Sequence, residues 1–439
     1  MKSGPGLPAD RLRPAATPAI PIGRAYDTLI QLQAALEEVA DWTSITGAMR
    51  RGVDLVDGVE LLAATDHPER VRAAVAPLAG DSSVSAHEDN LLTLDVERVP
   101  VVIRCVAADR AGAELLHSTG SATHLASLQE RAQTRGQVLD RSGLLSHDGV
   151  NLIAASEESI YTDLGLPFIP PELREGDEAF AAAERGQLPN LVSLEDMRGD
   201  LHVHSLWSDG RDTIEAMVVS AIALGYEYMA ITDHSPSSAA SRNLTTDSVA
   251  RQAEEIANIR TMYPQITVLH GCEVDILDDG GLDFPDSLLE RFDIVLASLH
   301  ESYGHAPDVL LRRYERAMRH PLVSLITHPS NRMFPHRPGY DVDYDRLFQL
   351  AVETGTLLEI DGGPSHIDLD AGLARRAVRA GVTLSIDSDC HVAARLGRQM
   401  QLGVVTARRG WVEAERVLNT KPLRDVQAHI AAKRQGRAS

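Results

Sequence analysis

Residues 200–233 read DLHVHSLWSDGRDTIEAMVVSAIALGYEYMAITD, and this stretch decides the fold of the second half of the chain. Apolar and β-branched residues predict one strand at 200–204 and another at 226–232. Between them, an Asp212/Thr213 cap, apolar residues at helical spacing and a stop at Gly225 predict a helix over 213–224. A strand, a helix and a second strand in this order indicate a parallel sheet.

The same alternation continues toward the C-terminus. Further apolar runs, with helical patterns between them, lie at 266–274, 293–299, 322–327, 356–360 and 382–386. Seven such units within roughly 240 residues suit a closed or distorted barrel. The fold class expected for this half is therefore α/β, with a distorted (β/α)7 barrel.

The first half groups its strands instead of alternating them with helices. An amphipathic pattern predicts a helix from about Ala25 to Glu38. Short apolar runs separated by turn residues predict strands of a mixed sheet at 43–46, 58–65, 91–97 and 99–108. Residues 110–135 have a helical pattern again, and a segment rich in proline and glutamate carries the chain to 197 as a small helical element and a connector. This order predicts an α+β unit.

The composition excludes several classes of protein. Of 439 residues, 44% are apolar and 24% are charged. Together with the lack of any apolar run of about eighteen residues, this excludes a membrane protein, a coiled coil and a mostly disordered chain. Three cysteines are too few for a secreted scaffold held by disulfides. The proline-rich residues 1–24 lack the apolar core of a signal peptide, so we expect a disordered tail and a cytoplasmic protein with no membrane partner.

The charge balance limits the possible partners. The chain has 63 acidic and 42 basic side chains, a net charge of −21. Such a surface repels phosphate backbones unless a local patch or bound cations reverse the field, so we expect weak nucleic-acid binding. Twelve of the seventeen histidines lie after residue 195. This asymmetry places the expected chemistry in the second half.

Each predicted strand of the second half ends in side chains that can bind a metal ion. A barrel brings the C-terminal ends of its strands to one rim. His-x-His on a strand directs both imidazoles to one face, because side chains alternate along a strand. The strand-end set is Asp200, His202, His204, Asp209, Asp233, His234, Glu273, His300, His328, Glu359, Asp361, Asp387, Asp389 and His391.

The chemistry of this set predicts a metal-dependent hydrolase. Imidazole and carboxylate together suit Zn²⁺, Mn²⁺ or Fe²⁺, and the set contains no thiolate. It offers more ligands than one tetrahedral ion can use, so a multinuclear site follows. Such sites clamp a phosphoryl group and bring the pKa of a bound water close to neutrality.

Other polar residues of these strands fit simpler roles. His270 stands in the middle of a predicted strand, where packing is expected. Asp233 and Asp387 each lie one residue away from the ligand positions on a strand, so they point elsewhere and fit roles in tying loops. Cys272 and Cys390 fit as small buried residues.

The motifs RGDLHVHSLWSDG, AITDHS, GCEVDIL, LASLHES, ITHP and DSDCH resemble those of the PHP (polymerase and histidinol phosphatase) domain. More specifically, they resemble the C-terminal domain of bacterial family X DNA polymerases, over nearly all of 160–433. The resemblance implies a distorted seven-stranded barrel with Mn²⁺-dependent 3′-5′ exonuclease and phosphodiesterase activity and up to three metal ions. The metal ligands and catalytic residues that it implies are His202, His204, Asp209, His234, Glu273, His300, His328, Asp389 and His391.

The chain departs from this family near the expected site. Glu301 follows His300 where the family usually has a small polar residue. His366 stands where the polymerase family tends to have arginine, and Asp361 where it tends to have asparagine. These changes leave all nine ligands in place and affect the expected substrate preference.

The first half resembles the polymerase core of the same family in a degenerate form. ITGAMRRGVDLVDGVELL (45–62) resembles the palm motif, but Ala48 replaces its serine, and Gly58 and Glu60 replace its Asp-x-Asp pair. Val102 stands at the position of the third catalytic aspartate. Transfer of a nucleotide by two metal ions needs these carboxylates, so we expect that polymerase activity is lost.

The resemblance also sets the expected domains. STGSATHLASLQERAQTRG (118–136) and ASEESIYTDLGLPFIPPELRE (155–175) match the edge of the palm and the thumb. The family's helix-hairpin-helix module, which normally precedes the palm, is expected to be absent. We expect a disordered tail at 1–24, a degenerate palm at 25–115, a thumb-like region and connector at 116–195, and a PHP domain at 196–439.

Three functions remain open at this point. The leading hypothesis is a 3′-5′ exonuclease or phosphodiesterase that acts on DNA ends, with Arg332 and Arg337 as the phosphate-binding residues. A phosphatase for small phosphate esters, of the histidinol phosphatase type, is the first alternative. A non-catalytic accessory protein of DNA repair is the second. For the enzymes we expect two or three divalent ions, with Mn²⁺ favoured over Zn²⁺ and Fe²⁺; the sequence does not set the oligomeric state.

Overall fold

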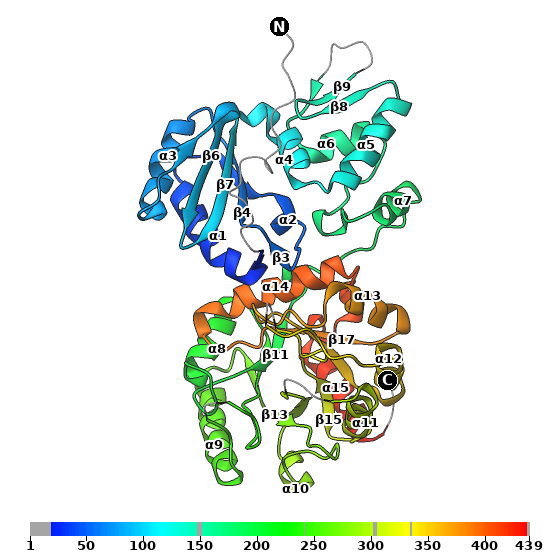
Figure 1. Ribbon diagram of the computed structural model, residues 1–439. Coiled ribbons are helices and arrows are strands. Elements are labelled where there is room, and N and C mark those ends of the chain that lie inside the picture. Colours follow the sequence, from blue (N-terminus) through cyan, green and yellow to red (C-terminus); the bar gives the residue numbers. More distant parts are fainter. Residues whose placement is uncertain (1–18, 147–151, 241, 302–304, 334–335, 437–439) are drawn as a thin grey trace. The chain divides into compact units, whose positions relative to one another are not determined.

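The computed structural model describes residues 19–146, 152–240, 242–301, 305–333 and 336–436 (Figure 1). The chain divides into two compact units, residues 1–188 and 189–439, each with its own contacts. Among the described residues, none of the helices combines the length and the apolar character that crossing a membrane requires.

The end of the predicted disordered tail needs a correction. Strand β1 (Ile20–Pro21) pairs with β3 (Leu55–Val56), and helix α1 (Ile22–Leu36) begins before the predicted Ala25. The cause is the apolar run around these residues, since Ile20 and Ile22 are both buried. The rest of the predicted tail, residues 1–18, lies outside the described residues.

A mixed five-stranded sheet forms the centre of the first unit, as the sequence predicts. Its order is β2 (Trp42–Ile45), β4 (Val59–Ala64), β7 (Val99–Val106), β6 (Leu91–Val96) and β5 (Ser85–Ala86). Strands β4 and β7 run parallel, and the other pairs are antiparallel. Along β7, buried residues alternate with half-buried ones, so one face of the sheet packs on the core. Helix α3 (Pro68–Val75) packs against α1 in the same unit.

The predicted helical stretch at 110–135 is two helices, α4 (Ala111–Thr119) and α5 (Ala122–Thr134). The helix ends because Gly120 adopts a φ of +67°, which favours glycine, and the Ser121 side chain then caps α5 by accepting from His124 N. A small antiparallel sheet that the sequence did not predict follows. Its strands are β8 (Val138–Asp140), β9 (Gly143–Leu145) and β10 (Leu152–Ile153).

Short helices complete the first unit: α2 (Gly47–Arg50), α6 (Glu157–Asp163) and α7 (Glu178–Glu184). A buried ion-pair network joins α2 and α6 to Arg174. The Glu157 carboxylate accepts from Arg50 Nη2 and from Arg174 Nη1, both at 2.6 Å. Because Arg174 is fully buried, this pairing fixes the position of α6 relative to α2.

The second unit is a nearly closed barrel of seven parallel strands, which confirms the predicted fold class. The strands are adjacent in sequence order: β11 (Gly199–Val203), β12 (Tyr228–Ile231), β13 (Thr267–Asp275), β14 (Ile294–Ser298), β15 (Val323–Ile326), β16 (Leu357–Asp361) and β17 (Leu384–Asp387). An isolated parallel bridge between Val203 and Cys390 brings the first strand beside the segment that follows the last.

Helices surround this barrel: six lie between consecutive strands, and a seventh, α14, follows the last strand. They are α8 (Ile214–Ala223), α9 (Thr246–Met262), α10 (Asp286–Leu289), α11 (Pro307–Met318), α12 (Tyr344–Thr354), α13 (Ala371–Ala380) and α14 (Leu396–Arg409). The Thr213 side chain caps α8 as predicted, by accepting from Ala216 N. Six of the strands share a further apolar cluster with the last helix, α15 (Leu423–Arg434), through Val426 and Ile430. The strand-end residues therefore sit on a fully packed scaffold.

Candidate metal centre

His202 and His204 meet at the end of β11, as their spacing predicts. Their Nε2 atoms lie 3.0 Å apart, and both side chains are fully buried. The loop after β11 adds Asp209, β12 leads to His234, and β17 leads to Asp389 and His391. The alternation of side chains along strands, together with barrel geometry, thus gathers these donors at one rim.

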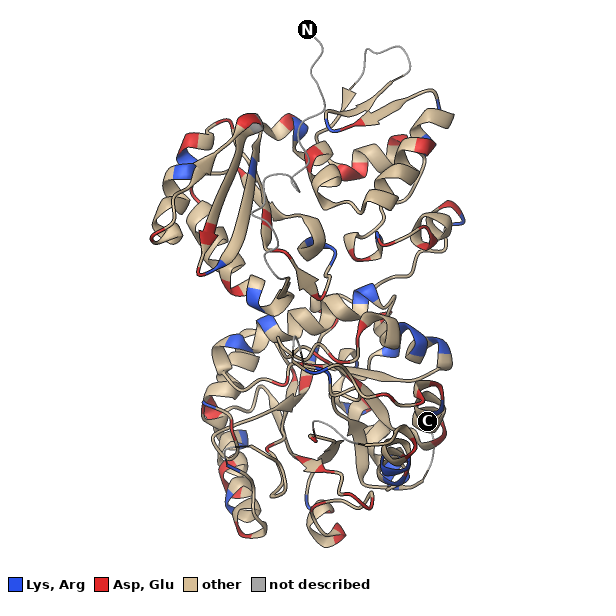
Figure 2. Ribbon diagram, in the orientation of Figure 1, with Lys and Arg blue, Asp and Glu red and all other residues tan. Residues whose placement is uncertain are grey.

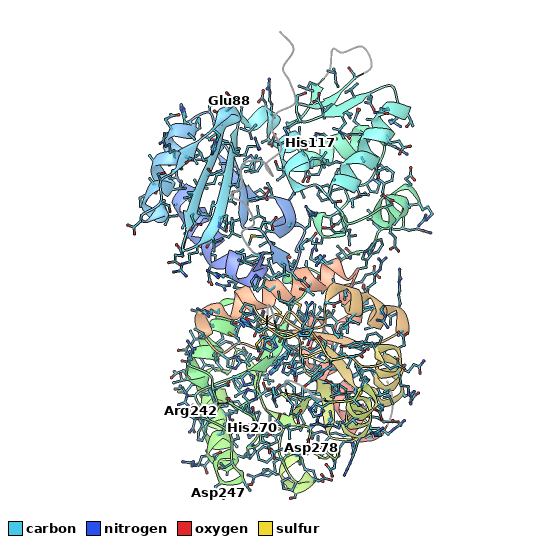
Figure 3. The ribbon with its side chains drawn as sticks, in the orientation of Figure 1. Glu88, His117, Arg242, Asp247, His270 and Asp278 are labelled. Carbon is cyan, nitrogen blue, oxygen red and sulfur yellow. The ribbon has the colours of Figure 1, made fainter. Side chains whose placement is uncertain are left out.

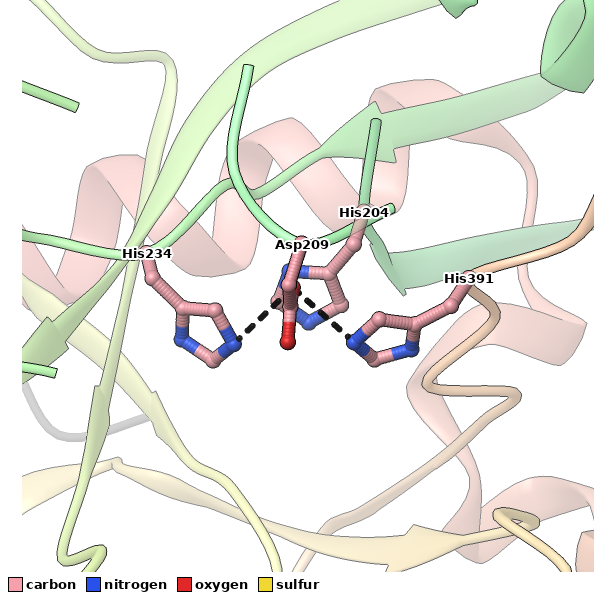
Figure 4. A group of neighbouring side chains, drawn as sticks. All are labelled: His204, Asp209, His234 and His391. Atoms are coloured by element: carbon pink, nitrogen blue, oxygen red, sulfur yellow. Dashed lines mark ion pairs between the residues drawn. The ribbon is translucent and has the colours of Figure 1, made fainter. Parts of the chain in front are cut away.

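Donor atoms from these elements, together with those of Glu273 on β13 and His300 after β14, form three groups close enough to hold an ion each. The first is the group drawn in Figure 4, in which Asp209 Oδ1 lies 3.1 Å from His391 Nε2 and 3.5 Å from His234 Nε2. The groups share members, so neighbouring ions would share ligands. Their members are His204, Asp209, His234 and His391; His202, His204 and Asp389; and His234, Glu273 and His300.

Glu273 lies among the imidazoles from several strands. Its Oε2 atom is 2.8 Å from His234 Nδ1 and 3.4 Å from His202 Nε2, yet it makes no hydrogen bond within the described residues. Its Oε1 atom is 2.9 Å from His328 Nε2 and 3.5 Å from His300 Nε2. His328 therefore joins the site through Glu273, although it belongs to none of the three groups.

Three of the imidazoles are held in a defined orientation. The Nδ1 atom of His202 lies 2.7 Å from Glu359 Oε1, that of His300 lies 2.5 Å from Asp275 Oδ1, and that of His391 lies 2.9 Å from the Asp389 carbonyl. An acceptor at Nδ1 places the proton there and leaves the Nε2 lone pair for an ion. Glu359 also accepts from His328 N at 2.6 Å.

Some positioning residues were not predicted. The sequence gives no sign of the role of Asp275 beyond its position two residues after Glu273, on the same face of β13. Arg242 (labelled in Figure 3) donates to the carbonyls of Ser208 and Gly210, which flank Asp209. No local pattern of sequence connects Arg242 with that loop.

Asp233 and Asp387 tie loops, as predicted. Asp233 accepts from the backbone and side chains of Ser205 and Ser208, which orders the loop that carries Asp209. Asp387 Oδ1 accepts from Leu201 N at 2.8 Å and thereby joins the last strand to the first.

The packing roles predicted for the other residues are also confirmed. His270 (Figure 3) contacts the ring of Phe292 and lies 3.0 Å from Gln252 Oε1, and burial lowers its pKa to about 4. Cys272 and Cys390 are buried, and burial raises the pKa of both thiols.

The charges of the site depend strongly on one another. Burial alone would lower the pKa of His202, but Glu359, Glu273 and Asp389 hold it well above its usual value. Burial alone would raise the pKa of Glu273, but His202, His234 and His300 hold it well below. Burial lowers the pKa of His204 to about 3, with further lowering from His391 and His234. Opposite charges in a dry environment therefore stabilise one another here.

The residues fit divalent ions. Glu273 Oε2, His204 Nδ1 and His234 Nδ1 are buried without a hydrogen-bond partner among the described residues, and leaving such atoms unsatisfied costs several kcal/mol. The donors are imidazoles and carboxylates, which suit Zn²⁺, Mn²⁺ or Fe²⁺. A set of ions shared between the three groups would satisfy these atoms.

The two predicted phosphate-binding arginines hold loops together. Arg332 Nε donates to the carbonyls of Ile367 at 2.7 Å and His366 at 3.1 Å. Arg337 Nε donates to the carbonyl of Asn331 at 2.6 Å. The ring of His366 lies 5.6 Å from that of His328, so these loops reach the edge of the donor cluster.

The polymerase-like positions Gly58 and Val102 of the first unit carry no carboxylate, and the backbone at Gly58 leaves no room for a side chain. Glu60 and Val102 are register partners on the parallel strands β4 and β7. Gly58 has a φ of +153°, and a Cβ atom there would lie 2.2 Å from the Pro100 carbonyl oxygen. A cavity of about 480 Å³ lies beside these strands, lined by Glu60, Val102 and also His117 (Figure 3).

Comparisons with known proteins agree with both halves. The PHP domain family matches residues 200–361, and the DNA polymerase beta thumb family matches residues 114–175. The "DNA polymerase/3'-5' exonuclease PolX" of Bacillus subtilis (strain 168) is 36% identical over 421 residues, which cover 93% of this chain and 72% of that protein.

Shorter proteins match the second half. A "Probable phosphatase" of Syntrophotalea carbinolica is 31% identical over 205 residues, 44% of this chain and 80% of that protein. Another, of Thermoanaerobacter sp. (strain X514), is 29% identical over 236 residues, 50% of this chain and 89% of that protein.

Proposed function

The chain belongs to the bacterial family X of DNA polymerase/3′-5′ exonuclease proteins, and from this premise we propose that its barrel hydrolyses phosphodiester bonds at the 3′ ends of DNA. The chain is an enzyme, a metal-dependent phosphoesterase of the PHP class. The observation that carries the proposal is the convergence of imidazoles and carboxylates from separate strand ends on Glu273.

The proposed metal ligands and catalytic residues are those that the resemblance implies. Two or three divalent ions, with Mn²⁺ first among them, would be held by His202, His204, Asp209, His234, Glu273, His300, His328, Asp389 and His391. When bound, such ions activate a water and stabilise charge on the phosphoryl oxygens. In the reaction, the oxygen of water forms a bond to phosphorus and the bond to the leaving O3′ breaks. A proton from the water ends on that O3′, so a nucleoside 5′-monophosphate leaves.

This chain's own residues keep the donors in place during the reaction. Glu359 and Asp275 hold the Nδ1 protons of His202 and His300, so the Nε2 atoms keep facing the centre. Asp233 orders the loop of Asp209. Arg332 and Arg337 are the proposed phosphate contacts; because their guanidinium groups already donate to loop carbonyls, a phosphate would share those donors.

The proposed domains follow the expected ones. Residues 25–115 would be a palm that has lost nucleotide transfer, 116–195 a thumb-like region with a connector, and 196–439 the phosphoesterase. Gly58 and Val102 support the loss, because neither can hold a metal ion. DNA would be bound weakly, chiefly at the metal centre.

A second candidate substrate is a small phosphate ester. It is favoured by the relatives named "Probable phosphatase", which match the barrel without the first half. The non-catalytic accessory role has no such support, because eight of the nine proposed donors fall into the three donor groups and the ninth, His328, contacts Glu273.

The test is a comparison of kcat/KM for single-stranded oligonucleotides of increasing length and for histidinol phosphate, each at two salt concentrations. We expect turnover of oligonucleotides from the 3′ end, with kcat/KM that changes little with length. If the monoester is turned over far faster than every oligonucleotide, the exonuclease assignment fails and the phosphatase takes its place.

A further inference from the structure

A cavity of about 690 Å³ opens beside His300 and continues away from the donor cluster. Asp275 and His300 form its inner end, and Ile276, Leu277 and Ala239 give it an apolar part. Its size is that of an ordinary ligand site. His300, one of the proposed metal ligands, lines the cavity, so the cavity adjoins the donor cluster.

Carboxylates dominate the charge of this cavity. Of the nine described residues that line it, four are acidic (Asp275, Asp278, Asp279 and Glu301) and none is Lys or Arg. Cations behind the wall offset part of this charge: Arg313 pairs with Glu301 at 2.7 Å, and Arg316 pairs with Asp279 at 3.1 Å. Asp278 (Figure 3) is 94% exposed, with Arg313 4.0 Å away.

A buried carboxylate oxygen gives independent evidence of a ligand here. Asp275 is only 7% exposed, and its Oδ1 atom contacts His300. Its Oδ2 atom is buried and has no hydrogen-bond partner among the described residues. A buried acceptor of this kind is costly unless something donates to it.

The basic side chains lie at the other end of the imidazole row. The rings of His300 and His328 are 5.3 Å apart, and those of His328 and His366 are 5.6 Å apart. Arg332 donates to the carbonyl of His366 at that end. Arg332 is itself paired there with Asp370 at 3.8 Å, so carboxylates lie at both ends of the row; the cavity beside His300 differs in having no guanidinium group among its described lining residues.

We propose that the cavity beside His300 receives the terminal group of the substrate, the group esterified to the phosphate on the side away from the DNA chain, and selects it by charge. Groups that carry an ammonium are favoured over neutral groups, and groups that carry a further anion are rejected. Asp278 and Glu301 set this preference. The proposal rests on the proposed phosphoesterase function.

The test uses three alkyl groups of similar size that differ in charge: aminoalkyl, hydroxyalkyl and carboxyalkyl. Each is esterified to the 3′ phosphate of the same oligonucleotide, and each is also prepared as a free phosphate monoester. In each series, the expected order of kcat/KM is amino, then hydroxy, then carboxy, with about tenfold between the extremes. Raising the salt concentration should compress this order, because exposed charges are screened.

Two variants and one control test whether the order of kcat/KM for the three groups depends on the residues that line the cavity. Asp278→Lys changes an exposed position and should lower the amino-to-carboxy ratio at least about threefold. Glu301→Gln should lower it in the same direction, and it serves as the second variant because it alters a different wall. Asp308→Asn, an exposed carboxylate paired with Arg312 outside the cavity, should leave the ratio as in the unaltered protein.

The outcomes separate the two claims. Equal kcat/KM for the three groups in either series would overturn the charge selection. An amino-to-carboxy ratio of kcat/KM that Asp278→Lys does not change would overturn it too. Both results would leave the proposed phosphoesterase activity intact. No metal-dependent turnover of any ester in either series contradicts the proposed function itself.

Discussion

Glu359 contacts two of the proposed metal ligands at once. One carboxylate oxygen holds His202 Nδ1, the other accepts from His328 N, and the side chain is fully buried. A single carboxylate therefore fixes the direction of one imidazole and the backbone that carries another. Such a group affects ion binding without touching the ion.

Glu359→Gln should weaken ion binding about 10–100-fold, because the amide holds His202 less firmly and removes a charge that favours the site. Isothermal titration of the ion-stripped protein with Mn²⁺ measures this. The matched control is Glu227→Gln, which removes an exposed carboxylate paired with Arg198 and should leave the affinity unchanged. Equal affinities for both variants would show that Glu359 has no positioning role.

The pKa values of the ligand histidines predict how ion binding depends on pH. Burial alone would lower the pKa of His234, His300 and His391, but the neighbouring carboxylates raise these values to about 10, 9 and 9. Without ions, these imidazoles are thus protonated at neutral pH, whereas a coordinating imidazole is neutral.

The apparent affinity for Mn²⁺ should therefore rise with pH up to about pH 9, and binding at neutral pH should release protons. Calorimetry in buffers of different ionisation enthalpy counts the protons. An affinity that is constant from about pH 6 to pH 9, with no proton release, would contradict the account of these charges.

Gly58, just before β4, and Val102, on β7, stand at positions where the resembling polymerase palm has catalytic aspartates. At Gly58, just before β4, the φ of +153° and the nearby Pro100 carbonyl leave no room for a side chain. The family's aspartate at this position thus requires a different backbone, in addition to a different residue. Val102, by contrast, lines a cavity on β7.

Restoring the aspartates should not restore polymerase activity. Gly58→Asp with Val102→Asp should give no templated incorporation with any divalent cation, and should lower the free energy of unfolding by about 1–3 kcal/mol because of the clash. Val102→Asp alone is the control and should be better tolerated. Primer extension and thermal unfolding are the measurements. Extension by the unaltered protein that is lost on changing Glu60 would overturn the remnant interpretation.

Secondary structure could be predicted where the sequence is strongly periodic. The seven barrel strands and the helix after β11 follow from apolar runs and a Thr213 cap. The sheet of β8, β9 and β10 could not be predicted, because strands of two or three residues carry no periodicity. The break at Gly120 and Ser121 lay inside a continuous helical pattern, which local backbone geometry overrode.

One part of the candidate site could be predicted from the sequence, and another part could not. Its donors could be predicted because each lies at or soon after the C-terminal end of a strand, and the fold brings strand ends together. Asp275 and Arg242 could not, because their roles depend on contacts with distant segments.

The charge of the whole molecule governs how it meets a polyanion. The net charge is −21, and Figure 2 shows acidic and basic residues interspersed on both units. DNA binding should therefore be weak and only mildly salt-dependent, with a slope of log affinity against log salt of about −1 to −2, since few phosphates are neutralised. Fluorescence anisotropy with a labelled oligonucleotide measures the slope. A steep slope would indicate that DNA binds to a basic surface with many phosphate contacts, which would contradict this prediction.

The most direct test of the central claim joins ion content to hydrolysis. The protein is purified, its ions are counted by elemental analysis, and cleavage of a 5′-labelled oligonucleotide is followed before and after chelation and after addition of Mn²⁺. The account predicts two or more transition-metal ions per chain, shortening from the 3′ end that chelation abolishes and Mn²⁺ restores, and no cleavage by a folded His202→Ala/His204→Ala variant. Full activity in the ion-stripped protein, or an unchanged double variant, would contradict it.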